Sequence, residues 1–294
     1  MQKKTMTMTS LSSVKHIRIG WFFPERGIIY VVIAIYLFIT LAPLAWVLST
    51  SFKPNEEAVG FPPTFLPKDP TLDNYAFVLT DPSLVRSLIN SFVVSIGSTA
   101  LSVATSALAG YAFARYDFRG KNVIMSIILG IFMIPILINL IPLYIMLGNI
   151  GLLNSLIALI LTSQILIIPL NIFLLKNYFE TIPRELEEAA LIDGCSRLGA
   201  LRHITAPLSM PSFAIAAVLS FRFSWNEFIL PIVLANRGDV TVFQVALYQF
   251  ISLYGIDWGY LTAGINLALI PVLVLMLIFQ KQMIRGLTLG AVRE

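Results

Sequence analysis

The chain is poor in the residues that form disulfides, metal sites and acid–base catalytic groups. It has a single cysteine, Cys195, which excludes an intrachain disulfide and any metal site built on paired cysteines. Its two histidines, His16 and His203, have no further metal-ligand residues grouped around them in the sequence. We therefore expect this chain to bind no metal ion and no cofactor of its own.

Charged residues are also scarce. Only 12% of the 294 residues are charged and 57% are hydrophobic, whereas soluble domains are about a quarter charged. The mean hydropathy is +0.83. The net charge of +4 could indicate nucleic-acid binding. Its basic residues lie between apolar runs, however, and this favours orientation in a lipid bilayer with no nucleic-acid partner.

Long apolar runs are abundant. A bilayer core about 30 Å thick needs about 20 helical residues. Five runs meet this length, and a sixth does so although Arg222, Asn226 and Glu227 interrupt it. They predict an all-α polytopic membrane protein with six transmembrane helices: Ile28–Ser51, Leu88–Ala114, Val123–Leu147, Leu156–Leu175, Phe213–Ala235 and Tyr260–Phe279.

The basic residues predict the orientation. With six spans both termini lie on one side, and fifteen of the 20 lysines and arginines then fall on that side. The positive-inside rule makes this side cytoplasmic. We therefore expect a cytoplasmic tail at 1–27, a six-helix transmembrane domain at 28–285 and a cytoplasmic tail at 286–294. No cleavable signal peptide is expected, because the first apolar run is too long.

Two features of the runs concern helix packing. Pro135 and Pro142 remove backbone donors and predict kinks or unwinding in the third run. Small residues, which let a second helix approach closely, recur at every fourth position of the second run: Ser98, Ser102, Ser106, Gly110 and Ala114. The six prolines of Phe52–Ser87 predict an ordered external cap with short turns.

The segment between the fourth and fifth runs, 181–207, is unusually polar. Pro183 and the glutamates that follow it favour a helix start, and Gly194 can end that helix in a left-handed conformation. Ser196 can cap a second helix and Pro207 can end it. The segment therefore predicts two short helices that project from the membrane and dock on a soluble partner, with Ala189 and Ala190 allowing close approach.

The spacing within this segment resembles a known family. Glu188, Ala189, Ala190, Gly194, Ile204 and Pro207 match the EAA loop of binding-protein-dependent ABC importer permeases, except that Ala206 stands where the family usually has Leu. Nearly the whole chain is similar to the carbohydrate-type permeases, and to the six-span permease of maltose and glycerol-phosphate type systems. The further matches are Ser51–Lys53, Asn74–Tyr75, Asn90–Ser91, Ala109–Arg115, Ile141–Tyr144, Ile182–Pro183, Trp225–Phe228 and Gly286–Val292.

The resemblance implies a function and partners. The chain would be a type I ABC importer permease in a bacterial or archaeal inner membrane, working by alternating access. A second permease subunit would complete the pathway, making a heterodimer, and an extracytoplasmic solute-binding protein would deliver a sugar or sugar-like solute. Two cytoplasmic ATPases would use ATP and Mg²⁺. The ATPase-coupling residues would be Glu188, Ala189, Ala190, Asp193, Gly194, Ile204 and Pro207.

Two alternatives come from other functional classes. An ion-coupled secondary transporter usually has internal repeats and membrane carboxylates, whereas Glu227 is the only carboxylate in these runs and we find no clear repeat. A membrane enzyme needs clustered ligands or a nucleophile and base, and the runs contain no histidine. The one Gly-Lys pair, Gly120-Lys121, lacks the remaining residues of a phosphate-binding P-loop. We therefore expect ATP hydrolysis on a partner.

Polar residues within the runs are the candidates for solute contact. Trp225, Asn226 and Glu227 combine an aromatic face with groups that can bind hydroxyls; the alternative is that they anchor the span at the outer membrane interface, where Trp is common. Arg222 lies near the predicted bilayer centre, and we expect it to pair with a group on another helix. We expect interhelical hydrogen bonds rather than solute contacts from the remaining amides: Asn139, Gln164, Asn171 and Asn266.

Overall fold

The structure is a computed structural model that describes residues 24–235, 237–252 and 255–291. Most of the predicted N-terminal tail, with His16, and the last three residues of the predicted C-terminal tail lie outside this range. The chain forms two units, 1–45 and 46–294, which are described separately. Helix α1 (Pro24–Thr50) supplies the described part of the first unit, and its side chains between 27 and 45 are almost all exposed.

Helices of membrane-spanning length match four of the predicted runs. They are α1, α4 (Pro82–Arg115), α7 (Leu156–Glu180) and α14 (Trp258–Ala291). Two further pairs of helices have sufficient apolar length but bend sharply at a short break. In the described part of the chain, therefore, four helices can cross a membrane singly, and the number rises to six if each bent pair makes one crossing.

The third predicted run is broken at one of its two prolines. Helix α5 (Lys121–Ile131) and helix α6 (Ile136–Asn149) are inclined at 92°. Pro135 precedes α6 with an extended backbone, whereas Pro142 lies inside α6. The expected unwinding is therefore found at Pro135. Because a proline is tolerated at a helix start, Pro135 fits the break without an unpaired donor of its own.

The prediction of one continuous helix over Phe213–Ala235 is wrong. Helix α11 (Met210–Trp225) stops at Trp225, and α12 (Ile229–Leu234) follows after three residues. The Glu227 carboxylate accepts hydrogen bonds from the backbone N–H groups of Ile229 and Leu230, at 2.9 and 3.1 Å. It thereby caps α12, satisfying donors that a helix start leaves free.

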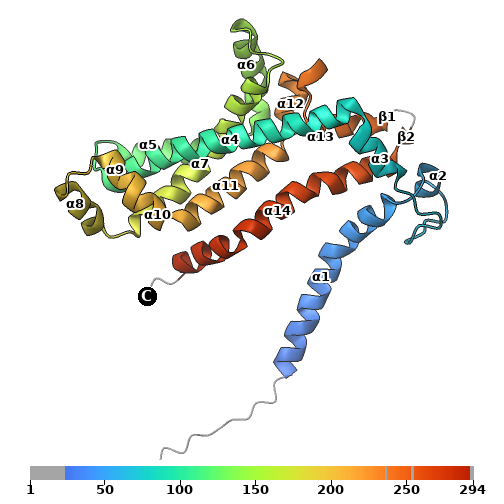
Figure 1. The fold of residues 1–294 in the computed structure, drawn as a ribbon, viewed down its shortest axis with the longest axis horizontal. Helices are drawn as coiled ribbons and strands as arrows, with labels where there is room; N and C mark the ends of the chain where they lie inside the picture. The colour runs from blue at the N-terminus through green and yellow to red at the C-terminus, as the bar shows by residue number, and fades with distance from the viewer. Residues whose placement is uncertain (1–23, 236, 253–254, 292–294) are drawn as a thin grey trace, which may run out of the picture. The chain divides into compact units, whose positions relative to one another are not determined.

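The second unit is built on α4, which packs along α7 and α11, and α14 packs on α11 (Figure 1). The small-residue stripe of α4 is buried, as predicted. A Cβ atom at Gly110 would lie 3.1 Å from the backbone nitrogen of Lys176 and 3.3 Å from Leu175 Cβ in α7. Only glycine therefore fits this crossing without displacing backbone.

Interhelical hydrogen bonds follow the same stripe. Asn171 donates to the Ser102 and Ser220 hydroxyls at 2.8 and 2.7 Å, which ties α7 to α4 and α11. Gln164 donates to the Ser98 carbonyl at 3.3 Å, and Asn266 donates to Tyr75. These three predictions are confirmed, whereas Asn139 has no side-chain hydrogen bond with any described residue.

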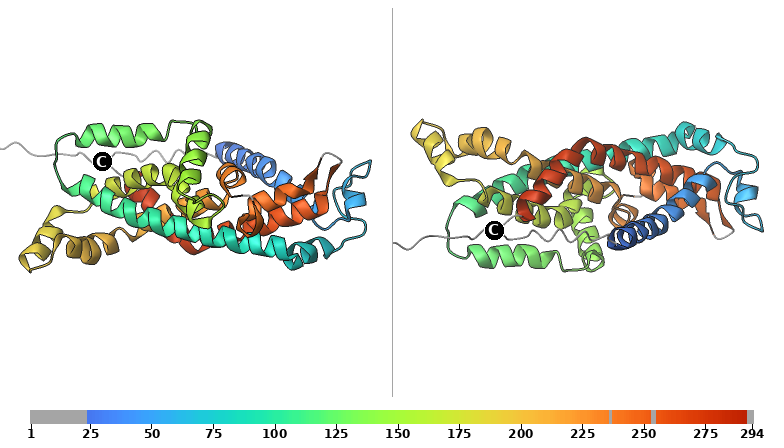
Figure 2. Two further views of the ribbon diagram at one scale, coloured as in Figure 1. Left: turned by 90° about the horizontal axis from the view of Figure 1, so that it is seen from above. Right: turned by 90° about the horizontal axis from the view of Figure 1, so that it is seen from below.

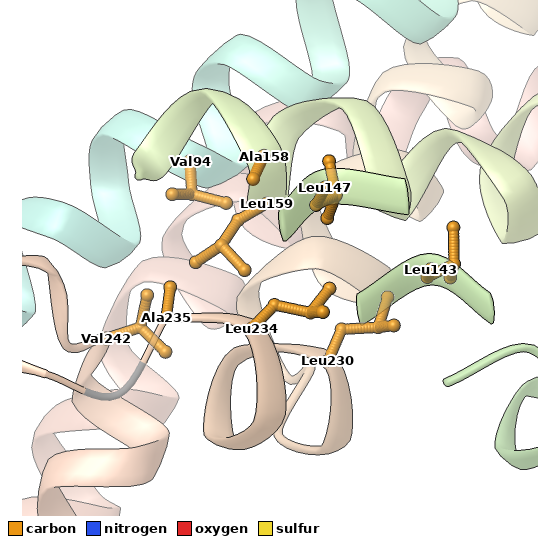
Figure 3. Packing of buried hydrophobic residues seen from close by; sticks show 9 residues of the cluster. All are labelled: Val94, Leu143, Leu147, Ala158, Leu159, Leu230, Leu234, Ala235 and Val242. Carbon is orange, nitrogen blue, oxygen red and sulfur yellow. The ribbon is translucent and has the colours of Figure 1, made fainter. Parts of the chain in front are cut away.

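An apolar cluster joins the broken segments to the bundle. Leucines from α6, α7 and α12 meet in it, as Figure 3 shows (Leu143, Leu147, Leu159, Leu230 and Leu234). The bent pieces are therefore packed parts of the fold.

The end of the second unit that carries the predicted cap has short elements. These are α2 (Asn55–Ala58), α3 (Asp73–Thr80), η2 (Gly238–Val240), α13 (Phe243–Leu247), η3 (Tyr248–Phe250) and the antiparallel strands β1 (Ile251–Ser252) and β2 (Gly255–Ile256). Asn74 holds the cap by donating to the carbonyls of Ser51 and Lys53. The predicted ordered cap is therefore found, and the two short strands are a minor exception in a fold that is otherwise helical.

Candidate functional site

The polar segment 181–207 folds into a compact helical block, the coupling block, which comprises α8 (Arg184–Ile192), α9 (Arg197–Ala200), η1 (Leu201–Thr205) and α10 (Ala206–Leu208). It lies at one end of the second unit, beside the last turn of α4 and opposite the end that carries α3 and the strands (Figure 2). The chain then bends by 85° at Ser209 into α11. The two predicted short helices are therefore present.

The turn between the helices has the predicted local chemistry. Gly194 has φ +88°, a left-handed conformation that costs a residue with a Cβ about 1–2 kcal/mol. The Ser196 hydroxyl accepts from the Gly199 N–H at 3.1 Å and caps α9. Pro207 does not end the second helix as predicted, because α10 continues to Leu208 and the break falls at Ser209.

One face of the coupling block is open and partly apolar. Glu188, Ala189, Asp193 and Gly194 are exposed, and Ile192 is 86% exposed. Leu198 on α9 is exposed as well. Ala190 and Ile204 are half-buried, and Pro207 is exposed. Isoleucine is among the residues most often buried, so Ile192 at the helix end marks a surface suited to a partner.

The opposite face holds a buried ion pair that the sequence analysis missed. Glu187 is the only buried side chain of α8. Its Oε1 lies 2.8 Å from both Nε and an Nη of Arg115, and the two side chains are 4% and 5% exposed. Tyr111 donates to Oε2 at 2.8 Å, and Thr205 donates to Oε1. We call these four residues the Glu187 cluster.

The charge of Glu187 is stabilised by these donors. Burial raises the pKa of its carboxyl, but the hydrogen bonds from Arg115, Thr205 and Tyr111 outweigh burial and hold the pKa below its ordinary value. The carboxylate therefore stays ionised at neutral pH. Its contribution to stability is fully present above the ordinary pKa of a glutamate and is lost only as the pH falls through the lowered value.

Two of the proposed solute residues, Trp225 and Glu227, line the same small cavity, and Asn226 is not part of its lining. Trp225 is 1% exposed, its ring stacks on Phe221, and its Nε1 donates to the Ala268 carbonyl at 2.9 Å. Its ring is therefore packed among side chains of the second unit. Glu227 caps α12, and Asn226 is exposed at the break.

Arg222 lies one turn before Asn226 and is also exposed. Its guanidinium lies 5.5 Å from the ring of the adjacent Phe223 and makes no ion pair or hydrogen bond with any described residue. The pairing expected within the chain is thus not found in its described part. Arg222 and Asn226, together with the half-buried Ile215 and Leu219, form a face of α11 that the second unit leaves open.

Comparisons with known proteins agree on one family. Residues 102–288 match the family model described as binding-protein-dependent transport system inner membrane component. The chain is 35% identical to the sulfoquinovosyl glycerol transport system permease protein SmoH of Agrobacterium fabrum, in an alignment that covers 92% of this chain and 95% of SmoH. It is also 35% identical to the arabinooligosaccharides transport system permease protein AraQ of Halalkalibacterium halodurans, in an alignment that covers 88% of this chain and 94% of AraQ.

A solved structure supports the fold. A chain of a bacterial ABC transporter involved in the import of the acidic polysaccharide alginate superposes with a TM-score of 0.76, covering 88% of this chain and 96% of that one at 24% identity. The family model and the relatives cover most of the chain, including the coupling block. The chain belongs to the family of inner membrane components of binding-protein-dependent transport systems.

Proposed function

We propose that this chain is the permease subunit of an ATP-driven importer and that its coupling block docks in a cytoplasmic ATPase. The exposed face around Ile192 carries this proposal. That face combines a water-exposed apolar side chain with small residues, and it lies in a block held rigidly to the bundle through Glu187. The six-residue match to the EAA spacing agrees with it. Glu188, Asp193 and Gly194 border the same surface.

The membrane arrangement follows from the two broken segments. If α5 with α6 makes one crossing and α11 with α12 makes another, the chain crosses six times and both termini are cytoplasmic, on the side with the coupling block. This is the side to which the excess of lysine and arginine assigns the loops. A second permease subunit then lies opposite the open face of α11, across the pathway, and a solute-binding protein delivers the solute on the side opposite the coupling block.

The solute is proposed to be a sugar or sugar-like molecule. SmoH and AraQ are named for transport of a sulfoquinovosyl glycerol and of arabinooligosaccharides, and the alginate transporter imports an acidic polysaccharide. A second alginate transporter structure was solved with a pentasaccharide-bound periplasmic protein. The ion-coupled alternative is disfavoured because Glu227, the one carboxylate within the predicted spans, is occupied as the cap of α12.

Co-purification and uptake together test this function. When the chain is expressed with its candidate partners, we expect it to purify with a second permease and two ATPase subunits. In proteoliposomes that contain the complex and receive the solute-binding protein, uptake should require ATP inside and should persist when ionophores abolish ion gradients. Uptake that needs no ATP and stops with the ion gradient would establish the secondary transporter instead.

We further propose that the open face of α11 lines the pathway, with Asn226 and Arg222 in contact with water. In a Cys195→Ser background, a cysteine in place of Asn226 should react with a membrane-impermeant hydrophilic thiol reagent, and transported solute should slow the reaction. A cysteine in place of the buried Ser224 is the matched control and should stay unreactive. Equal reactivity at the two positions would contradict this assignment.

A further inference from the structure

We propose that Glu187 is the positioning residue that joins the coupling block to the membrane helices, so that a displacement of α8 moves α4 and α11 with it. This inference rests on the proposed function and names the contact through which coupling passes. From α8, the carboxylate accepts hydrogen bonds from two other elements: the last turns of α4 through Tyr111 and Arg115, and η1 through Thr205.

The rest of α8 is weakly attached. The large apolar side chains Leu186 and Ile192 are exposed, and no α8 residue belongs to the described apolar clusters of the bundle. The connections at its N-terminal end are two hydrogen bonds to backbone, from Arg184 to the Ala114 carbonyl and from Arg115 to the Ile182 carbonyl. Apart from the chain connections at its two ends, the buried side-chain contact through which α8 can pass a force to the bundle is therefore that of Glu187.

The donors of the cluster lead towards two different helices. Tyr111 and Arg115 lie on α4, which packs along both α7 and α11. Thr205 ends a single π-helical turn, a feature often found at functional sites, and the chain then enters α11 after the bend at Ser209. Glu187 thus holds the end of one membrane helix against the segment that leads into another.

The chemistry of the cluster suits a rigid joint. A buried carboxylate that accepts a hydrogen bond from a guanidinium is held in a defined position, because charge-assisted hydrogen bonds are short and directional. The hydroxyls of Tyr111 and Thr205 donate to the same carboxylate. Since the guanidinium is itself buried, separating the pair would leave a charge without a partner. The cluster therefore resists separation of the block from the helix ends.

The experiment uses the complete complex with its solute-binding protein in proteoliposomes and measures solute taken up per ATP hydrolysed. For Glu187→Ala we expect the complex to assemble and hydrolyse ATP, with uptake per ATP reduced about tenfold, within the usual range of coupling between sites. Glu187→Gln should be intermediate, because its amide oxygen still accepts hydrogen bonds but lacks the charge. Glu180→Ala removes the carboxylate of an exposed ion pair at the end of α7 and should leave the ratio unchanged.

Two conservative variants decide the matter if Glu187→Ala does not accumulate. Tyr111→Phe and Thr205→Val each delete one hydrogen bond to the carboxylate and keep the side chain's shape. A lowered uptake per ATP in either one supports the inference. An unchanged ratio in both, or in an assembled Glu187→Ala complex, overturns it. Failure of the wild-type complex to couple uptake to ATP would instead refute the proposed function.

Discussion

Replacing Gly110 by leucine should strongly reduce the amount of folded protein in the membrane. Any side chain at this position meets the backbone of α7 at Lys176 and the Cβ atom of Leu175. Backbone cannot rotate away as a side-chain tip can, so α4 and α7 must separate. Overpacking of this kind costs on the order of 3 kcal/mol, and separation also lengthens the hydrogen bonds of Asn171 to Ser102 and of Ser98 to Ser163.

The matched control is Gly130→Leu. A Cβ atom at Gly130 would have nothing within 4 Å, so the same increase in volume should be tolerated on α5. The measurement is the yield of detergent-solubilised monodisperse protein and its thermal unfolding midpoint. Similar yields for the two variants would mean that the close crossing of α4 and α7 does not support the fold.

Replacing Ile192 by aspartate should abolish ATP-driven uptake by preventing ATPase docking. The side chain is 86% exposed in the chain itself, so the substitution leaves the permease fold intact. In a docked complex the new carboxylate would be buried without a partner, and this costs several kcal/mol. We therefore expect a permease that inserts normally and purifies without its ATPase subunits.

Asn122→Asp is the control for charge alone. Asn122 is exposed in the first turn of α5, and the substitution adds the same carboxylate outside the coupling block. Subunit stoichiometry after purification and ATP-dependent uptake are measured for both variants. Normal stoichiometry and normal uptake in Ile192→Asp would place the ATPase contact elsewhere on the protein.

Run length and hydropathy predicted α1, α4, α7 and α14 because both properties are local. The same reasoning did not show where a run bends. Pro135 indicated one break correctly. Nothing local distinguished Pro142, which the helix accommodates, and nothing local showed that Glu227 would turn back to cap a new helix after Trp225. These outcomes depend on packing against other helices.

In the candidate site, too, features set by neighbouring residues were predictable and features set by distant residues were not. The turn chemistry at Gly194 and Ser196 was predictable because each residue acts on its immediate neighbours. Glu187 was not distinguished from the adjacent Glu188, because its role depends on Arg115, 72 residues earlier. Hydrophobic pattern misleads in α8, where the isoleucine points outward and a glutamate is buried. This reversal is expected wherever the outer face of a helix is itself a binding surface.

The exposed Ile192 and Leu198 also bear on how the cell makes the transporter. A copy of the chain that has reached the membrane without an ATPase presents two large apolar side chains to water on its proposed cytoplasmic side. Chaperones and membrane proteases select such surfaces. Under the proposed function, we therefore expect the amount of permease that persists in the membrane to depend on the supply of its ATPase.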